Sequence, residues 1–415
     1  MRSLEDWLRY IEAQHPATIA LGLDRVRQVF SRLGIEITSP VITVSGTNGK
    51  GSTCAMLESV LRAAGYRTGL YTSPHLVRYN ERVRIDGTEA DDTALSESFT
   101  AVEAARHGVP LTYFEFGTLG MLWLLSRMNL DALVLEVGLG GRLDAVNVVD
   151  ADCAVLTSVG IDHVEYLGTD RESIGAEKAG IFRSGRPAVV ADPDPPQSVL
   201  RADARLLLFN RDFGCEAADR QWTYWGPSGR RGGLEHPALR GAVQLRNAAA
   251  ALCALDTLRE RLPLAMQHVR RGLAEVSLPG RFQVLPGRPQ LILDVAHNVE
   301  AARTLAHNLA APPFAPETIA VCGMLRDKDI TGVLREVAPR VTQWHLASLP
   351  GPRGAQASVL AAALSGRVVR EHASVGEALG AAQAAAGEND KIIVFGSFVT
   401  VGEAIAWLKR RTSSH

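Results

Sequence analysis

The chain has 415 residues, of which 46% are hydrophobic and 21% are charged, and its formal net charge is −1. This length allows two or three domains with large buried cores, and the near-neutral charge gives no electrostatic reason to expect binding to nucleic acid or to an anionic membrane surface. The five cysteines are scattered without metal-binding spacing, which favours reduced thiols in a cytoplasmic protein, and no apolar run reaches membrane-spanning length.

The start of the chain, MRSLEDWLRYIEAQ, predicts an amphipathic helix and not a signal peptide, because it carries acidic residues and no apolar core. Strands and helices then alternate, which favours an α/β fold with mainly parallel sheets. The predicted strands cover 41–44, 67–71, 132–137, 153–157 and 188–190, and the predicted helices cover 51–64, 91–106, 115–128, 170–182 and 245–262. Residues 191–242, rich in Pro, Gly and Arg, are predicted to be irregular.

A second series of elements follows the segment LPGRFQVLPGRPQ at 278–290, whose glycines and prolines indicate a domain boundary. Its predicted strands cover 291–294, 318–322, 343–347 and 391–395, and its alanine-rich helices cover 300–311, 355–365 and 375–386. We therefore expect an N-terminal P-loop domain over residues 1–285, with a mainly parallel sheet, and a smaller Rossmann-like domain over residues 286–415.

The segment VITVSGTNGKGST at 41–53 is typical of a phosphate-binding loop between a strand and a helix. Its three glycines let backbone N–H groups converge on an anion at the positive end of the helix. Lys50 would neutralise phosphate charge, and Ser52 could bind Mg²⁺. The loop departs from the Walker pattern G-x-x-x-x-G-K-[ST], because Val44 stands in the place of the first glycine and Gly51 separates lysine from serine. The alternative is an ordinary glycine-rich turn.

Three polar residues follow other predicted strands at what should be the same sheet edge. Glu136 ends a buried strand, where an unpaired carboxylate would cost several kcal/mol. A Mg²⁺ ion near a nucleotide would compensate for that cost, and the alternative is an ion pair with an arginine such as Arg142. Ser73 and His163 could complete a site for a hard cation, although an imidazole is an unusual ligand for Mg²⁺.

Two further segments leave alternatives open. Lys178 lies on a predicted helix, where an ordinary solvated lysine is the alternative. In LILDVAHN, the strand-end Asp294 suits a ribose hydroxyl, and His297 could meet a phosphate or a substrate carboxylate. A turn that caps the following helix through Asn298 explains the same pattern equally well.

Ten motifs, taken in order, resemble the ADP-forming amide ligases of the Mur ligase superfamily, and more narrowly its dihydrofolate synthase/folylpolyglutamate synthase family. They are HPATIALGLDRV, VSGTNGKGST, YTSPHL, TYFEFGTLGMLWL, LEVGLGGRLDAVN, TSVGIDHVEYLG, RESIGAEKAGIFRSG, LPGRFQV, LDVAHN and VFGSF. The resemblance implies an enzyme that joins L-glutamate to dihydropteroate and adds γ-linked glutamates to tetrahydrofolates through an acyl phosphate. It also implies ATP, two Mg²⁺ ions, small-molecule partners only and a monomer.

The resemblance assigns roles by position. The ATP contacts are Thr47, Asn48, Gly49, Lys50, Gly51, Ser52, Asn247, Arg281 and Asp294. The metal ligands are Ser52, Ser73, Glu136, His163 and a carbamylated Lys178, and the catalytic residues are Lys50, Lys178 and His297. The pterin contacts are Thr18, Ile19, Ala20, Thr112, Tyr113, Phe114, Glu115, Leu143, Asp144 and Ala145, and the glutamate contacts are His297 and Ser397.

Two positions depart from the family pattern. Ala20 stands where the family usually has an acidic residue, and Val299 stands where it usually has proline, which should alter only the start of the next helix. The alternatives to a bifunctional enzyme are a monofunctional folylpolyglutamate synthase, another Mur-type ligase, or a regulatory P-loop NTPase. The chain contains no N-K-x-D sequence for guanine recognition, which disfavours a GTPase.

Overall fold

The computed structural model describes residues 2–15, 19–219, 221–311 and 314–412. Its internal contacts divide the chain into two compact units, which are described separately. Unit 1 comprises Met1–His75, Tyr79–Ala238 and Gln244–Val276, and unit 2 comprises Leu76–Arg78, Leu239–Val243 and Ser277–His415. The chain passes from unit 1 to unit 2 for the last time between Val276 and Ser277, directly before the glycine- and proline-rich segment 278–290.

Unit 1 is built on an eight-stranded sheet, and the expected α/β fold with a mainly parallel sheet is confirmed. In spatial order its strands are β4 (Thr88–Glu89), β3 (Val83–Ile85), β2 (Thr68–Tyr71), β5 (Ala132–Glu136), β1 (Val41–Ser45), β6 (Cys153–Leu156), β7 (Pro187–Val190) and β8 (Arg205–Leu208). The strands from β2 to β8 in this order are parallel, whereas β3 and β4 extend the edge as antiparallel strands. The central strands are apolar on both faces because helices cover both.

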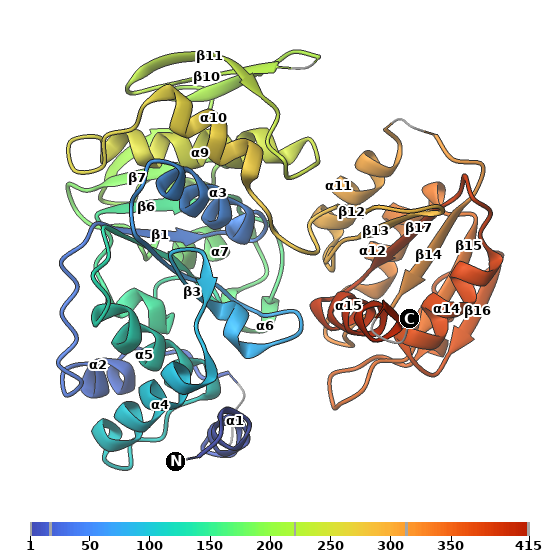
Figure 1. Ribbon diagram of the computed structural model, residues 1–415, viewed down its shortest axis with the longest axis horizontal. Coiled ribbons are helices and arrows are strands. Elements are labelled where there is room, and N and C mark those ends of the chain that lie inside the picture. Colours follow the sequence, from blue (N-terminus) through green and yellow to red (C-terminus); the bar gives the residue numbers. More distant parts are fainter. Residues whose placement is uncertain (1, 16–18, 220, 312–313, 413–415) are drawn as a thin grey trace. The chain divides into compact units, whose positions relative to one another are not determined.

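The helices of unit 1 cover the two faces of this sheet (Figure 1). They are α1 (Leu4–Glu12), α2 (Asp24–Phe30), α3 (Lys50–Ala63), α4 (Asp92–Arg106), α5 (Tyr113–Ser126), α6 (Val164–Leu167), α7 (Arg171–Ala179), α8 (Gln197–Leu200), α9 (Val243–Thr257) and α10 (Met266–Glu275), with short 3-10 turns at Tyr79–Arg82 and Ala145–Val148. Figure 1 shows α3, α9 and α10 on one side of the sheet and α2, α4 and α5 on the other. The amphipathic helix expected at the start of the chain is α1, which buries Leu4, Trp7 and Ile11.

The prediction that 191–242 is irregular was wrong. This segment contains β8 and a separate antiparallel sheet of β9 (Gly214–Ala217), β10 (Gln221–Gly226) and β11 (Gly229–Glu235). The alternating aromatic side chains of β10 explain why it forms a strand, because Trp222 and Tyr224 are both fully buried. Most glycines of this segment lie within these strands, among them Gly229, Gly232 and Gly233 in β11.

Unit 2 is the smaller unit and has a six-stranded sheet of Rossmann-like character. In spatial order the strands are β12 (Gln283–Leu285), β13 (Gln290–Leu293), β17 (Lys391–Phe395), β14 (Thr318–Cys322), β15 (Gln343–Ala347) and β16 (Val369–His372), all parallel except β12. Only the two edge strands, β12 and β16, were missing from the prediction, since both are short and carry polar residues.

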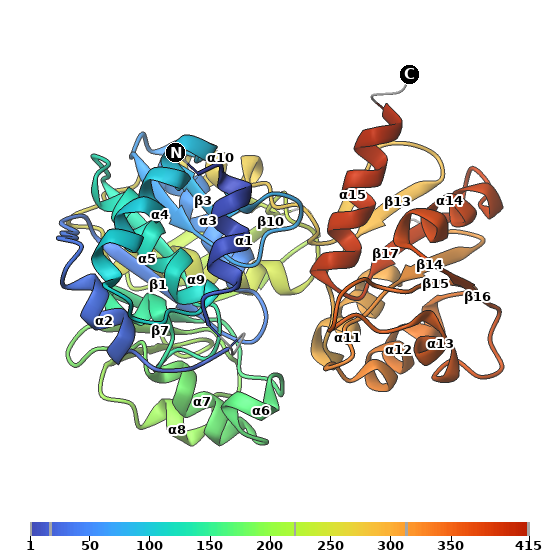
Figure 2. The same cartoon turned by 90° about the horizontal axis from the view of Figure 1, so that it is seen from below.

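Helices also cover both faces of the sheet of unit 2. They are α11 (Val299–Leu309), α12 (Ile330–Val337), α13 (Ala357–Ala362), α14 (Val375–Ala385) and α15 (Phe398–Thr412), with a 3-10 turn at Ala338–Arg340. Figure 2 shows α14 and α15 on one face and α11, α12 and α13 on the other, and each group closes its own apolar cluster. Across the described parts of both units, no helix has the length and apolar character needed to cross a membrane.

Candidate functional site

Four adjacent strands of unit 1 bring the expected site residues to one edge of the sheet. The strands β2, β5, β1 and β6 are neighbours and parallel, so their carboxyl ends meet at the same edge. Ser73 follows β2, Glu136 ends β5, the glycine-rich turn follows β1, and the segment 157–163 follows β6. The topology therefore gathers these parts of the predicted site, which are far apart in the sequence.

The glycine-rich turn is shaped for an anion. Gly49 has φ +91° and caps α3, whose first N–H groups lack partners within the helix. The Nζ of Lys50 donates to the carbonyl oxygens of Gly46 at 2.9 Å and Thr47 at 3.3 Å, which holds the ammonium over the turn. A side chain at position 46 could not be accommodated, because its Cβ would lie 1.9 Å from Oγ1 of Thr157.

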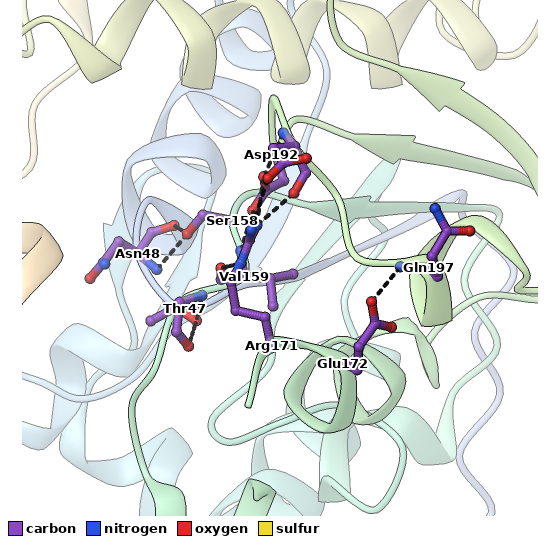
Figure 3. Close-up of polar contacts among 10 residues, drawn as sticks. Thr47, Asn48, Ser158, Val159, Arg171, Glu172, Asp192 and Gln197 are labelled. Carbon is purple, nitrogen blue, oxygen red and sulfur yellow. Dashed lines mark hydrogen bonds and ion pairs between the residues drawn. The ribbon is translucent and has the colours of Figure 1, made fainter. Parts of the chain in front are cut away.

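The turn is fastened to the segment that follows β6 (Figure 3). The backbone N–H of Thr47 donates to the carbonyl of Ser158 at 2.9 Å, and that of Asn48 donates to the Ser158 hydroxyl at 3.0 Å. The Thr47 hydroxyl in turn bonds Gly160. Because Ser158 already engages these two N–H groups, the backbone donors best placed for phosphate are those of the first turn of α3.

Helix α9 supplies two amides to the start of α3. Nε2 of Gln244 donates to the hydroxyl of Ser52 at 3.4 Å, and Nδ2 of Asn247 donates to Oε1 of Gln244 at 3.0 Å. Asn247 also lies directly against Gly49. The sequence reasoning identified Asn247 but missed Gln244, although its position three residues earlier on the same helix face was a usable signal.

The candidate metal ligands Ser73 and Glu136 lie side by side. Glu136 is buried, and its carboxylate accepts a hydrogen bond from the backbone N–H of Ser73 at 3.3 Å. Arg142, the arginine suggested as an ion-pair partner of Glu136, pairs instead with Glu177 at 2.7 Å. A buried carboxylate at a sheet edge beside the glycine-rich turn is a donor that suits Mg²⁺.

His163 stands in a strained backbone conformation, with φ +52°, which is rare for a residue other than glycine. The carboxylate of Asp162 accepts the His163 N–H at 2.8 Å and stabilises this turn. Within the described residues, no group of three or more His, Cys, Asp or Glu side chains is arranged to hold a metal ion. The expected ligand set depends instead on serine hydroxyls and on a modified Lys178.

Lys178 is not the ordinary solvated lysine that the helix pattern allowed, because its side chain is buried in unit 1. Burial, together with the nearby Lys50 ammonium, lowers the pKa of Lys178 to about 7, although the carboxylates of Asp162 and Asp144 oppose this shift. No described residue forms a hydrogen bond or ion pair with its amine. A buried, largely neutral amine is the chemical form that reacts with CO₂.

The candidate pterin residues at the start of α5 form a tightly bonded turn. The Thr112 hydroxyl and the Glu115 carboxylate make a reciprocal capping box. The other oxygen of Glu115 accepts from Arg25 at 2.7 Å, and the guanidinium of Arg25 also donates to the carbonyl of Ala20 at 2.9 Å. The Glu115 carboxylate is thus engaged within the protein, while the ring of Phe114 packs near that of Tyr71.

The second group of candidate pterin residues lies in the turn after β5. Asp144 is buried and accepts from the N–H groups of Leu139 at 2.8 Å and Val146 at 2.9 Å. Burial raises the pKa of Asp144 to about 6, and its backbone hydrogen bonds oppose that rise. The carbonyl of Leu143 accepts from Gly22 at 3.4 Å, which links this turn to the segment of Ile19 and Ala20. Ala145 is buried beside them, and Thr18 lies outside the described residues.

The remaining candidates belong to unit 2. The Asp294 carboxylate accepts from Phe282 and Ala296, each at 2.8 Å, and burial raises its pKa. Nδ1 of His297 lies 2.9 Å from the carbonyl of Val295, and the Arg281 guanidinium stacks on the ring of Phe398.

Two helix starts complete this part of unit 2. The Ser397 hydroxyl lies 2.8 Å from that of Thr400 at the start of α15. Asn298 caps α11, which begins at Val299, just before the predicted start of this helix at residue 300.

Comparison with known proteins decides the family. The middle domain of Mur ligases matches residues 44–255, and the glutamate ligase domain of Mur ligases matches residues 280–398. The chain belongs to the Mur ligase family. Within this family it is 46% identical to the dihydrofolate synthase/folylpolyglutamate synthase of Escherichia coli, over 99% of this chain and 96% of that protein.

Solved structures of Mur ligases agree with this assignment. The structure of E. coli FolC in complex with DHPP and ADP has a TM-score of 0.95 and 45% identity, and the match covers 99% of both chains. A bifunctional folylpolyglutamate synthase/dihydrofolate synthase with Mn, AMPPNP and L-glutamate bound has a TM-score of 0.91 and 46% identity, covering 99% of this chain and 98% of that one. The similarity therefore runs through both domains of the family.

Proposed function

We propose that the chain is an ADP-forming ligase that joins L-glutamate to dihydropteroate and adds γ-linked glutamates to tetrahydrofolates. The observation that carries the proposal is its similarity, over almost its whole length, to FolC bound to DHPP and ADP. The phosphate-binding turn and the buried Glu136 beside Ser73 provide matching chemistry at one sheet edge. ATP and a divalent metal enter the proposal because a relative binds AMPPNP and Mn.

The first step activates a carboxylate, which is otherwise a poor electrophile. An oxygen of the substrate carboxylate attacks the γ-phosphorus of ATP, the bond to the β-phosphate oxygen breaks, and an acyl phosphate and ADP result. The Lys50 ammonium, held over the turn by two carbonyl oxygens, would stabilise the charge that spreads over the transferring group. Asn247, Arg281 and Asp294 are assigned to the rest of the nucleotide.

The second step forms the amide. The amine of L-glutamate attacks the carbonyl carbon of the acyl phosphate, a tetrahedral intermediate collapses, phosphate leaves, and the nitrogen loses a proton. We assign the incoming glutamate to His297 and Ser397, which lie in unit 2. The pterin is assigned to the residues at the start of α5 and to those around Asp144.

Ser52, Ser73, Glu136 and His163 would hold Mg²⁺, and a carbamylated Lys178 would contribute to a second ion. These residues would place Mg²⁺ where it would neutralise phosphate charge. Carbamylation joins the neutral Lys178 amine to CO₂ and releases one proton. It exchanges a buried amine without a described partner for an oxygen ligand, and the pKa of about 7 supports it.

The carbamate is tested separately from turnover. The protein is incubated with ¹³C-bicarbonate and Mg²⁺, and a ¹³C carbamate resonance is sought in the parent and in Lys178→Met. We expect the resonance in the parent only, and more of it above pH 7 than below. Its absence from the parent at every pH would contradict the modification.

The function is tested by phosphate release from ATP with L-glutamate, in the presence and absence of dihydropteroate or a tetrahydrofolate. Release that depends on glutamate and on either pterin supports the bifunctional enzyme. Release with tetrahydrofolate alone identifies a monofunctional folylpolyglutamate synthase. Release that no pterin affects excludes a folate ligase and favours another Mur-type ligase or a regulatory NTPase.

Four further assignments belong to the same proposal. They are nucleotide binding over 1–285, glutamate binding over 286–415, a monomeric state and a cytoplasmic location. All five cysteines are free thiols, which supports a reducing compartment. Light scattering of the purified chain tests the monomer.

A further inference from the structure

Val159, in the segment that follows β6, has both of its backbone polar groups held by two charged side chains. Its N–H donates to the Asp192 carboxylate at 2.6 Å, and its carbonyl accepts from Nε of Arg171 at 2.9 Å. Arg171 and Asp192 are also paired with each other at 3.2 Å. The three residues form a closed ring of hydrogen bonds (Figure 3).

The two side chains come from different elements. Arg171 is the first residue of α7, and Asp192 follows β7. The Asp192 side chain is 6% exposed, so its charge depends on Arg171 for neutralisation. The Arg171 side chain is 39% exposed, so the pair is held in place by the buried Asp192 and by the hydrogen bond from Arg171 to Val159.

The neighbours of Val159 are the residues that hold the phosphate-binding turn. Ser158 accepts from the N–H groups of Thr47 and Asn48, and Gly160 bonds the Thr47 hydroxyl. A displacement of Val159 would move Ser158 and Gly160 with it, because all three are consecutive. The ring thus fixes the position of residues 158–160, which hold the phosphate-binding turn.

The ring also connects residues 158–160 to α7, which carries Lys178 seven residues after Arg171. A single guanidinium therefore links the segment that supports the phosphate-binding turn to the helix that presents the buried amine. Both are parts of the proposed nucleotide and metal site.

We propose that Arg171 and Asp192 are positioning residues of this site, which act through Val159 to keep the phosphate-binding turn in a fixed position relative to α7. The proposal rests on the proposed function in one respect, namely that the turn binds a nucleotide. Neither residue is assigned a contact with a substrate. Their removal should therefore weaken nucleotide binding without changing the affinity for glutamate.

The test uses Arg171→Lys, which keeps a positive charge beside Asp192 but loses the planar fork that reaches both Asp192 and Val159. Asp192→Asn removes the charge and keeps the shape. The matched control is Glu172→Gln. Glu172 is the next residue of α7, and its carboxylate also accepts from backbone N–H groups, those of Gln197 at 2.9 Å and Ser198 at 2.7 Å, but it points away from the turn (Figure 3).

Calorimetric titration with ADP gives the first readout, and the KM for ATP and for L-glutamate gives the second. We expect the ADP Kd and the ATP KM to rise about tenfold in Arg171→Lys and Asp192→Asn, because each change weakens the charge-assisted hydrogen bonds that hold Val159. The KM for glutamate should stay within about twofold in these variants, and Glu172→Gln should change none of the three.

Amide hydrogen exchange gives a third readout that needs no turnover. Exchange should accelerate at 46–49 and 157–160 in the two test variants, and at 197–200 in the control. Unchanged ADP affinity in both folded variants, or an equal loss in Glu172→Gln, would overturn the proposal. If the parent itself binds no ADP, the proposed function fails first, and the exchange pattern still decides whether the ring holds the turn.

Discussion

The side chain of Thr47 satisfies both backbone polar groups of Gly160: its hydroxyl accepts from the N–H at 2.9 Å and donates to the carbonyl at 3.1 Å. Thr47→Val has nearly the same shape but leaves both groups of Gly160 without this partner. Gly160 is half-buried, so the loss of this partner should cost about 1 kcal/mol. We expect about tenfold weaker ADP binding, measured by calorimetric titration.

Thr47→Ser is the control for this change, because it retains the hydroxyl and loses only a methyl group. Its ADP affinity should stay within about threefold of the parent. Equal losses in the valine and serine variants would show that the methyl group, and not the bond to Gly160, supports the turn.

A methyl group at Gly49 should impair nucleotide binding for a steric reason. The Cβ of Gly49→Ala would lie 2.7 Å from Oδ1 of Asn247, at a backbone φ of +91°. Asn247 must then move away from the start of α3. We expect about 1 kcal/mol loss of unfolding free energy from the positive φ, together with at least about tenfold weaker ADP binding.

Gly65→Ala separates the two effects. Gly65 follows α3 with φ +86°, and no atom lies within 4 Å of its added Cβ. This variant should lose a similar unfolding free energy in urea and keep its ADP affinity. If Gly65→Ala weakens ADP binding as much as Gly49→Ala, backbone strain in α3 and not the Asn247 contact is responsible.

The antiparallel sheet of β9, β10 and β11 is anchored to α9 through Asp256. This carboxylate accepts from the Tyr224 hydroxyl at 2.6 Å and from the Arg231 guanidinium at 2.6 Å, and its side chain is 2% exposed. Asp256→Asn should cost about 3 kcal/mol of unfolding free energy because it leaves a mostly buried guanidinium without its counter-charge. Tyr224→Phe removes one hydrogen bond and should cost about 1 kcal/mol. Equal losses in urea unfolding would contradict the dominant role of the ion pair.

Buried parallel strands and the turns at their ends were the parts of the fold that the sequence could predict. Long apolar runs such as 132–137 predict buried strands with few alternative structures. Because the carboxyl ends of parallel strands meet at one edge of the sheet, Ser73 and Glu136 are then expected to lie together, as they do. The small sheet was missed because glycine and arginine in β11 masked the alternation of Trp222 and Tyr224 in β10.

Residues that act through the backbone could not be predicted in the same way. Arg171 and Asp192 are ordinary polar residues in the sequence, and their importance depends on Val159, which each reaches only in the folded chain. The burial of Lys178 was equally hidden, because helical spacing alone does not reveal which helix face is covered.

Two histidines on adjacent strands of unit 2 should make stability depend on pH. Nδ1 of His345 and Nε2 of His372 share a hydrogen bond of 3.0 Å between rings whose planes are nearly parallel, and His345 is fully buried on β15. Burial and, to a smaller extent, the charges of His372 and Arg370 together lower the pKa of His345 to about 4. Burial also lowers the pKa of His372, although Glu377 on α14 opposes that shift.

The sign follows from comparing the two states. Unfolded His345 takes up a proton near pH 6.5, whereas the folded protein accepts it only near pH 4. The unfolded state therefore binds more protons in this window, and stability that is complete above pH 6.5 is lost as the pH falls to 4.

His345→Leu removes this linkage and also the ring nitrogen Nε2, which has no hydrogen-bond partner among the described residues. Urea unfolding of the parent and the variant at pH 7.5, 5.5 and 4.5 should show their difference in unfolding free energy shift by about 2 kcal/mol in favour of the variant at the lowest pH. If the unfolding free energies of the parent and the variant change with pH in parallel, protonation of the histidine pair does not destabilise the folded protein.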